Sequence, residues 1–168
     1  MKITYVKALL YAYPHVKDFY KAYSYQIHTK AHSSFYDLRP VETISDEIIE
    51  LTHRKYLLGD IFFAVRDVVK KFDKEDIKLI KLKYFGAELN PPIEKDRTYF
   101  RRQNRIVEKA ARYFEAIGVG DKYFQEEYLK VDAVRTYLEQ VVNNEARVES
   151  ALRTKLKEAK KKREVEGR

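Results

Sequence analysis

DRTYFRRQNRIVEKAARYFEAIG, residues 96–118, carries a periodic pattern that predicts a helix buried on one side. Its apolar residues recur at steps of three and four, as they do in a helix with a single buried stripe. Asp96 is suited to be the N-cap of this helix, and Gly118 is suited to end it. The predicted stripe consists of Tyr99, Gln103, Ile106, Val107, Ala110, Phe114 and Ile117, with Gln103 as its weak member.

The opposite face of the same segment is rich in arginine. Between residues 97 and 112 there are six basic residues and one acidic residue, Glu108. Arg97, Arg101 and Arg105 lie one turn apart, so their charges repel, and a folded core gives no reason for that arrangement. A polyanion does, because a guanidinium group can bind phosphate or a guanine edge through two hydrogen bonds. The pattern favours contact with nucleic acid, and the alternative is a solvated face on a generally basic protein.

The composition indicates one helical core and an acidic partner. The chain has 168 residues, 45% of them hydrophobic, with 5 glycines and 4 prolines, which favours a nearly all-helical fold over disorder. The net charge of +8 favours DNA, RNA or an acidic protein surface as a partner. The absence of cysteine excludes disulfides, thiolate zinc sites and cysteine nucleophiles. We recognise no membrane-spanning run and no signal peptide, so we expect a cytoplasmic protein without a membrane partner.

Helical periodicity continues through most of the chain and predicts an all-α, multi-helix bundle with a long C-terminal helix. Pro14 and Pro40 mark boundaries, and Pro91-Pro92 forbids a regular helix through that point. Asp73 is suited to cap the helix that follows it. The predicted helices span residues 2–13, 15–31, 46–72, 74–85, 96–118 and 122 to beyond 156.

Two of these helices have unusual features. Gly59 lies inside the helix predicted over 46–72, where glycine costs about 1 kcal/mol relative to alanine, so we expect a close helix contact there. The last helix is longer than a small core can cover, and Asn143-Asn144 is a candidate break within it. This helix either packs along the N-terminal pair of helices or pairs with a second subunit. Residues 157–168 are nearly all charged and are expected to form a frayed tail.

The histidines and tyrosines of the N-terminal half are interpreted mainly as packing or surface residues. His28 and His32 are four residues apart, a spacing that suits a shared metal, but no cysteine and no suitably placed carboxylate completes a site. We therefore expect no metal and no cofactor. The tyrosines of residues 11–25 are expected to pack in the core, and the alternative is a platform for stacking bases, which needs exposed rings in a basic groove.

EDIKLIKLKYFG, residues 75–86, and DRTYFRRQNRIVEKAARYF, residues 96–114, resemble region 4 of bacterial sigma factors and the small sigma-like transcriptional regulators of Gram-positive phages. In this resemblance the first segment is the supporting helix of a helix-turn-helix, ending in an aromatic pair and a glycine. The second segment is the recognition helix. The chain departs from the family between them, where only residues 87–96, with Pro91-Pro92, replace a helix and a tight turn.

The resemblance implies binding to duplex DNA and, as a second partner, RNA polymerase. It makes Thr98, Arg101, Arg102 and Arg105 the readers of base edges or phosphates and places Arg97 and Arg112 on backbone phosphates. Asn104 and Lys109 lie beside them on the basic face. The full set of candidate DNA-binding residues is Arg97, Thr98, Arg101, Arg102, Asn104, Arg105, Lys109 and Arg112.

The sequence therefore predicts a DNA-binding transcriptional regulator without catalytic activity. Its expected regions are residues 1–72 (N-terminal helices), 73–120 (helix-turn-helix-like, DNA-binding) and 121–168 (C-terminal helix with charged tail). One alternative is an assembly module, in which the C-terminal helix forms a homodimer seam and the arginines bind an acidic protein. A second alternative is an RNA-binding protein, favoured if the tyrosines of residues 11–25 are exposed.

Overall fold

A computed structural model describes residues 1–34, 37–88 and 97–166 of the protein, with side chains as far as Thr154. The protein is all-α, as predicted, and no strand occurs in these ranges. The 3₁₀ turns are η1 (Tyr13–His15) and η3 (Tyr128–Lys130). The helices are α1 (Ile3–Ala12), α2 (Val16–Ser33), α3 (Val41–Val69), α4 (Lys74–Tyr84), α5 (Arg97–Ala116), α6 (Asp121–Glu126) and α7 (Asp132–Glu166).

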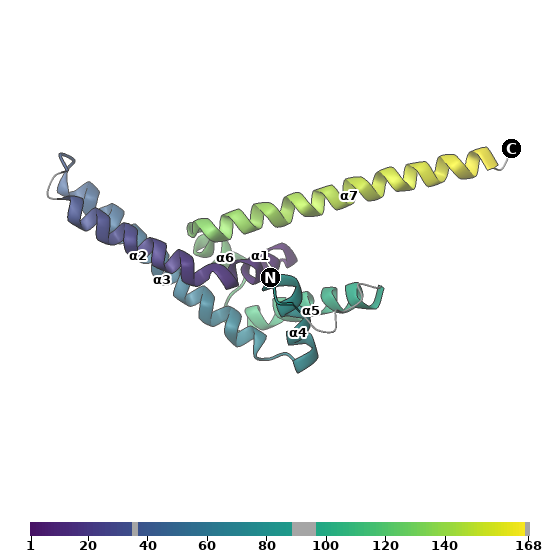
Figure 1. Cartoon of the computed structure of the whole chain (residues 1–168), viewed down its shortest axis with the longest axis horizontal. Helices are drawn as coiled ribbons and strands as arrows, with labels where there is room; N and C mark the ends of the chain where they lie inside the picture. Colours follow the sequence, from purple (N-terminus) through teal and green to yellow (C-terminus); the bar gives the residue numbers. More distant parts are fainter. Residues whose placement is uncertain (35–36, 89–96, 167–168) are drawn as a thin grey trace.

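The helices are arranged as a small core with two long arms (Figure 1). α2 and α3 lie side by side as an antiparallel hairpin that extends to one side of the core, and α7 extends to the other. Between the arms, α1 packs against α5 and the beginning of α7, and α4 and α6 complete the core. The buried cluster takes residues from all of these helices, so the three predicted regions share one core.

α5 buries the stripe that the sequence predicts. Tyr99, Gln103, Ile106, Val107, Ala110 and Phe114 are all buried. Ile117 is the exception: it follows the last helical residue, Ala116, and remains 39% exposed. The apolar periodicity therefore identifies the core-facing side of α5 correctly as far as the helix extends.

The residues predicted to mark helix boundaries lie at such boundaries. Pro14 lies in the 3₁₀ turn between α1 and α2. The side chain of Asp73 accepts a hydrogen bond from the backbone N–H of Asp76 at 2.7 Å, which caps α4. Gly86 and Gly118 follow α4 and α5 with φ of +67° and +86°, left-handed conformations that glycine adopts without strain. The predicted N-cap Asp96 lies outside the described residues.

α3 begins earlier than the sequence predicts, at Val41 instead of Asp46. Pro40 precedes it with φ of −55° and an extended ψ, which suits the entry into a helix, and Glu42 places an acidic group in the first turn. Ile44 is buried, and Glu47 pairs with both Lys30 and Arg39. These tertiary contacts stabilise a first turn that local capping signals alone do not indicate.

The single helix predicted from residue 122 onward is wrong, because the chain breaks it into α6, η3 and α7. Val131 has an extended backbone at the break. Contacts from distant helices stabilise this bend: Tyr128 donates a hydrogen bond to Asp60 at 2.7 Å, and Asp132 accepts hydrogen bonds from Tyr23 and Arg54. The candidate break at Asn143-Asn144 is also wrong, since α7 runs through both residues.

The close helix contact expected at Gly59 is not made within the described chain. A Cβ built at this position meets nothing within 4 Å.

None of the helices in the described ranges is long and apolar enough to cross a membrane.

Candidate nucleic-acid interface

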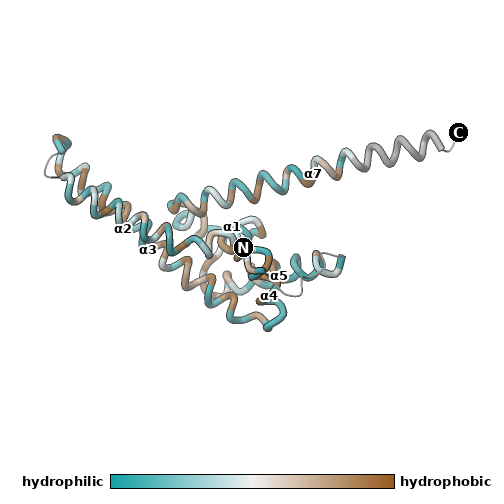
Figure 2. Tube along the Cα trace, viewed as in Figure 1, coloured by the Kyte–Doolittle hydropathy of each residue, from teal (hydrophilic) through white to brown (hydrophobic). Residues whose placement is uncertain are grey.

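α5 is held in the core along one side and exposed along the other. Its apolar stripe packs against α1, α3 and α4. Its N-terminal end lies at the outer edge of the molecule, and the hydropathy colouring shows this end as largely hydrophilic (Figures 1 and 2). The structure brings together six of the eight candidate residues on the exposed face: Arg97, Thr98, Arg101, Asn104, Arg105 and Arg112.

The arginines of this face form a line of positive charge. Arg97, Arg101 and Arg105 follow one another at single turns, so the line extends over about 12 Å of helix, close to the width of the DNA major groove. In the part of the chain that the structure describes, none of these three residues, nor Arg112, forms an ion pair. Their charge is therefore available to an anionic partner.

Arg102 is a neighbour of Arg101 in sequence but has a different role. Its Nε donates a hydrogen bond to Asp76 Oδ1 at 2.6 Å, and its guanidinium lies 3.5 Å from Asp73 Oδ1. Asp76 is only 7% exposed, so this ion pair joins α4 to α5 at the edge of the core. The hydrogen bond from the Asp76 N–H and the nearby Arg102 guanidinium hold the pKa of Asp73 below its ordinary value. Arg102 therefore helps to hold α5 against α4.

Gln103 makes the second connection between these helices. Its Nε2 donates a hydrogen bond to the Leu79 carbonyl at 3.1 Å inside the core. Its Oε1 is buried and accepts no hydrogen bond from any described residue. The sequence pattern treats Gln103 as a weak member of an apolar stripe and gives no sign of this contact, which fixes α5 against α4.

Lys109, like Arg102, lies toward α4. It is half-buried, and its ammonium group favours the ionised form of Asp73.

The connection between α4 and α5 consists of residues 85–96 and is much longer than the turn of about three or four residues in a standard helix-turn-helix. The expected departure at Pro91-Pro92 lies outside the described residues. Within them, Arg102 and Gln103 supply polar contacts that hold α5 against α4.

The histidines and tyrosines are distributed as follows. The rings of His28 and His32 lie 4.8 Å apart on the surface of α2, and no group of three or more potential metal ligands occurs among the described residues. Tyr23 is buried and donates a hydrogen bond to Asp132, whereas Tyr20 and Tyr25 are exposed. The tyrosines of residues 11–25 therefore do not form one exposed platform.

Comparison of the chain with protein-family models, with curated proteins and with solved structures found no match.

Proposed function

We propose that the protein binds duplex DNA through the exposed arginine face of α5 and acts as a transcriptional regulator. The observation that carries the proposal is the contrast between neighbouring arginines: Arg102 is paired with Asp76, whereas Arg101 and Arg105 face solvent without an acidic partner among the described residues. A line of unpaired like charges lowers the stability of a helix slightly. Phosphates along a DNA groove remove this repulsion and gain bidentate hydrogen bonds.

In this proposal α5 enters the major groove from its N-terminal end. Arg97, Thr98 and Arg101 lie in the first turns, which reach the outer edge of the molecule, and Arg112 lies farther along for a backbone phosphate. The resemblance of residues 75–86 and 96–114 to sigma region 4 adds RNA polymerase as a proposed second partner. The proposed location is the cytoplasm, a reducing compartment that suits a sequence without cysteine.

Replacement of Arg101 and Arg105 by alanine tests this interface. Each lost phosphate contact is expected to reduce the slope of log affinity against log salt by about 0.9, so the double variant should reduce it by about 1.8. Its affinity at moderate salt should fall about tenfold or more. The measurement is fluorescence anisotropy of a labelled duplex across a salt series.

Two controls make this experiment specific. Arg147→Ala/Arg153→Ala removes the same charge from exposed positions on α7 and should change the slope little. Arg102→Ala should lower the stability, because it leaves the Asp76 carboxylate without its cation, and should keep the slope. Equal slopes for wild type and the Arg101→Ala/Arg105→Ala variant would show that the arginine face does not bind DNA.

A homodimer through α7 is a second proposal, supported by an exposed apolar seam. Glu145 forms an ion pair with Lys7 of α1 at 2.6 Å. Beyond this pair, Val148 and Leu152 lie one turn apart, 60% and 55% exposed, on the arm that extends from the core (Figure 1). Apolar residues at this spacing suit a coiled-coil seam with a second copy of the chain.

Light scattering of the full chain tests the dimer. The wild-type mass is expected to be twice the 20.1 kDa of one chain, and Val148→Glu/Leu152→Glu should reduce it to one chain. Ser150→Glu places a single glutamate on the opposite face of α7 and should leave the dimer intact. A wild-type mass of one chain would exclude the seam.

A further inference from the structure

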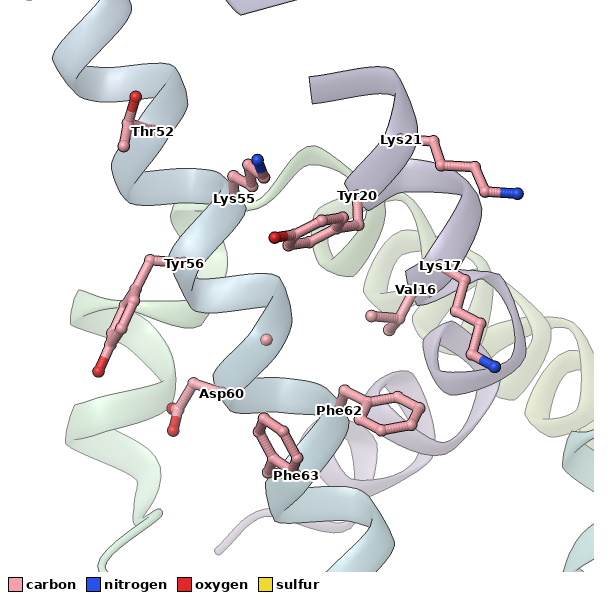
Figure 3. A pocket seen from close by; sticks show the side chains of 11 residues that line it. Val16, Lys17, Tyr20, Lys21, Thr52, Lys55, Tyr56, Asp60, Phe62 and Phe63 are labelled. Atoms are coloured by element: carbon pink, nitrogen blue, oxygen red, sulfur yellow. The ribbon is translucent and has the colours of Figure 1, made fainter. Parts of the chain in front are cut away.

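A groove on the α2–α3 arm lies away from the arginine face and has no part in the proposed DNA binding. Its volume is about 910 Å³, and its lining includes four aromatic rings, those of Tyr20 of α2 and of Tyr56, Phe62 and Phe63 of α3 (Figure 3). Tyr56 and Phe63 are well exposed to solvent. Large exposed rings gathered in one groove are typical of a binding surface.

The wall that α3 contributes contains a glycine. Thr52, Tyr56, Gly59 and Phe63 are spaced by four, three and four residues, so they share one face of α3 over three turns, about 16 Å. Gly59 lowers the stability of a helix interior, and nothing in the described chain lies within 4 Å of the position of its missing Cβ. Internal packing therefore does not require this glycine. A glycine at this position would instead allow the backbone of a partner molecule to approach α3 closely.

The rim of the groove is positively charged. Lys17 and Lys21 extend from α2 on one side, and Lys55 of α3 lies over the Tyr20 ring at 4.6 Å (Figure 3). None of the three lysines forms an ion pair within the described ranges. Asp60 also lines the groove, but its carboxylate accepts hydrogen bonds from the hydroxyls of Tyr123 and Tyr128, which partly satisfy its charge.

We propose that this groove binds an acidic amphipathic α-helix of a partner protein. The apolar side of that helix packs on Tyr56 and Phe63 in steps of three and four residues, and its backbone crosses closest at Gly59. Acidic residues on its flank pair with Lys17 and Lys21. This binding is independent of the arginine face of α5.

Three of the four rings have one face covered, which favours a helix over single-stranded nucleic acid as the partner. Phe62 is stacked on Tyr13 at 5.3 Å, Tyr20 has one face beneath the Lys55 ammonium, and Phe63 has one face beneath the Arg66 guanidinium at 4.7 Å. Bases bind by stacking on free ring faces, whereas leucine side chains can pack against ring edges and side-chain stems.

The probe is a labelled peptide of about 18 residues, five helical turns, with leucines along one face and glutamates on both flanks. Fluorescence anisotropy with the full chain should give a dissociation constant of about 10 µM or tighter. The same peptide with lysines in place of the glutamates should not bind. Single-stranded oligothymidine should not displace the acidic peptide.

The Gly59→Leu variant tests whether the peptide binds in the groove. The leucine side chain enters open space, so the variant should fold with a melting temperature equal to or above that of wild type, and its affinity for the peptide should fall about tenfold or more. Gly59→Ala should show a smaller loss. Ser45→Leu adds the same side chain to an exposed position of α3 two turns before the groove and should bind normally.

Lys17→Ala/Lys21→Ala should weaken the binding of the peptide and reduce the salt dependence of this binding. Arg101→Ala/Arg105→Ala should leave the binding of the peptide unchanged. Any of three results would overturn the proposal: no binding of the acidic peptide, full binding by a folded Gly59→Leu variant, or displacement of the peptide by oligothymidine. The last result would assign the groove to single-stranded nucleic acid.

Discussion

Phe114→Ala is expected to lower the free energy of unfolding by about 3–5 kcal/mol, because it removes a fully buried ring and leaves a cavity. Phe114 is 0% exposed and lies on the core side of α5. A domain of this size has a stability of about 5–15 kcal/mol, so a large share of it depends on this one side chain. The measurement is urea unfolding followed by circular dichroism.

Phe100→Ala is the matched control on the same helix. Phe100 is 54% exposed, so its removal should change the free energy of unfolding by less than about 1 kcal/mol. If Phe114→Ala also costs less than that, α5 is not anchored in the core as described. Loss of DNA binding in Phe114→Ala should accompany loss of helix signal, whereas Arg101→Ala/Arg105→Ala should lose binding while keeping its helices.

The stability of the protein is expected to fall steeply above about pH 10. Burial raises the pKa of Tyr84 above its ordinary value of 10.0, and burial together with the hydrogen bond to Asp60 raises that of Tyr128. Below pH 10 both tyrosines are neutral in the folded and the unfolded chain. Above pH 10 they ionise only in the unfolded chain, so the stabilisation that is fully present below pH 10 is lost at about 1.4 kcal/mol per pH unit for each tyrosine.

Urea unfolding at a series of pH values between about 9 and 12 measures this slope, to which these two tyrosines together contribute about 2.7 kcal/mol per unit. Tyr84→Phe should reduce the slope by about 1.4 kcal/mol per pH unit. At neutral pH this variant should be at least as stable as wild type, because the Tyr84 hydroxyl is buried without a hydrogen-bond partner among the described residues. Tyr25→Phe, at an exposed position, should leave the slope unchanged. A stability that does not depend on pH in this range would contradict the burial of Tyr84 and Tyr128.

The features that the sequence predicted well are those set by neighbouring residues. The buried stripe of α5 follows from its own periodicity, the cap at Asp73 from a carboxylate three residues before an N–H group, and the stop at Gly118 from the left-handed backbone that glycine tolerates. The all-α fold follows from the same local signals.

The features that the sequence did not predict depend on residues far apart in the chain. Arg101 and Arg102 are indistinguishable as sequence neighbours, and only the position of Asp76, 26 residues earlier, separates an exposed arginine from a paired one. The bend between α6 and α7 depends in the same way on Asp60, 68 residues before Tyr128. Local periodicity carries no information about such contacts.

The glycine in α3 is an intermediate case. The sequence indicates that Gly59 is unusual and predicts a close helix beside it, but the described chain has no helix there. The position of the groove needed the pairing of α2 with α3, which brings Lys17 and Tyr20 next to residues of α3.

The two arms also determine how the molecule moves through solvent. α7 has 35 residues and is therefore about 52 Å long, whereas a compact chain of 168 residues has a radius of gyration of only about 15 Å. Such an elongated particle experiences more friction than a sphere of equal mass. It should diffuse slowly and elute early from a sizing column, so that even one chain has the elution volume of a larger protein. A monomer could therefore be mistaken for a dimer if its mass were judged from elution volume alone. The number of chains has to be determined from a mass measurement that does not depend on shape, such as light scattering.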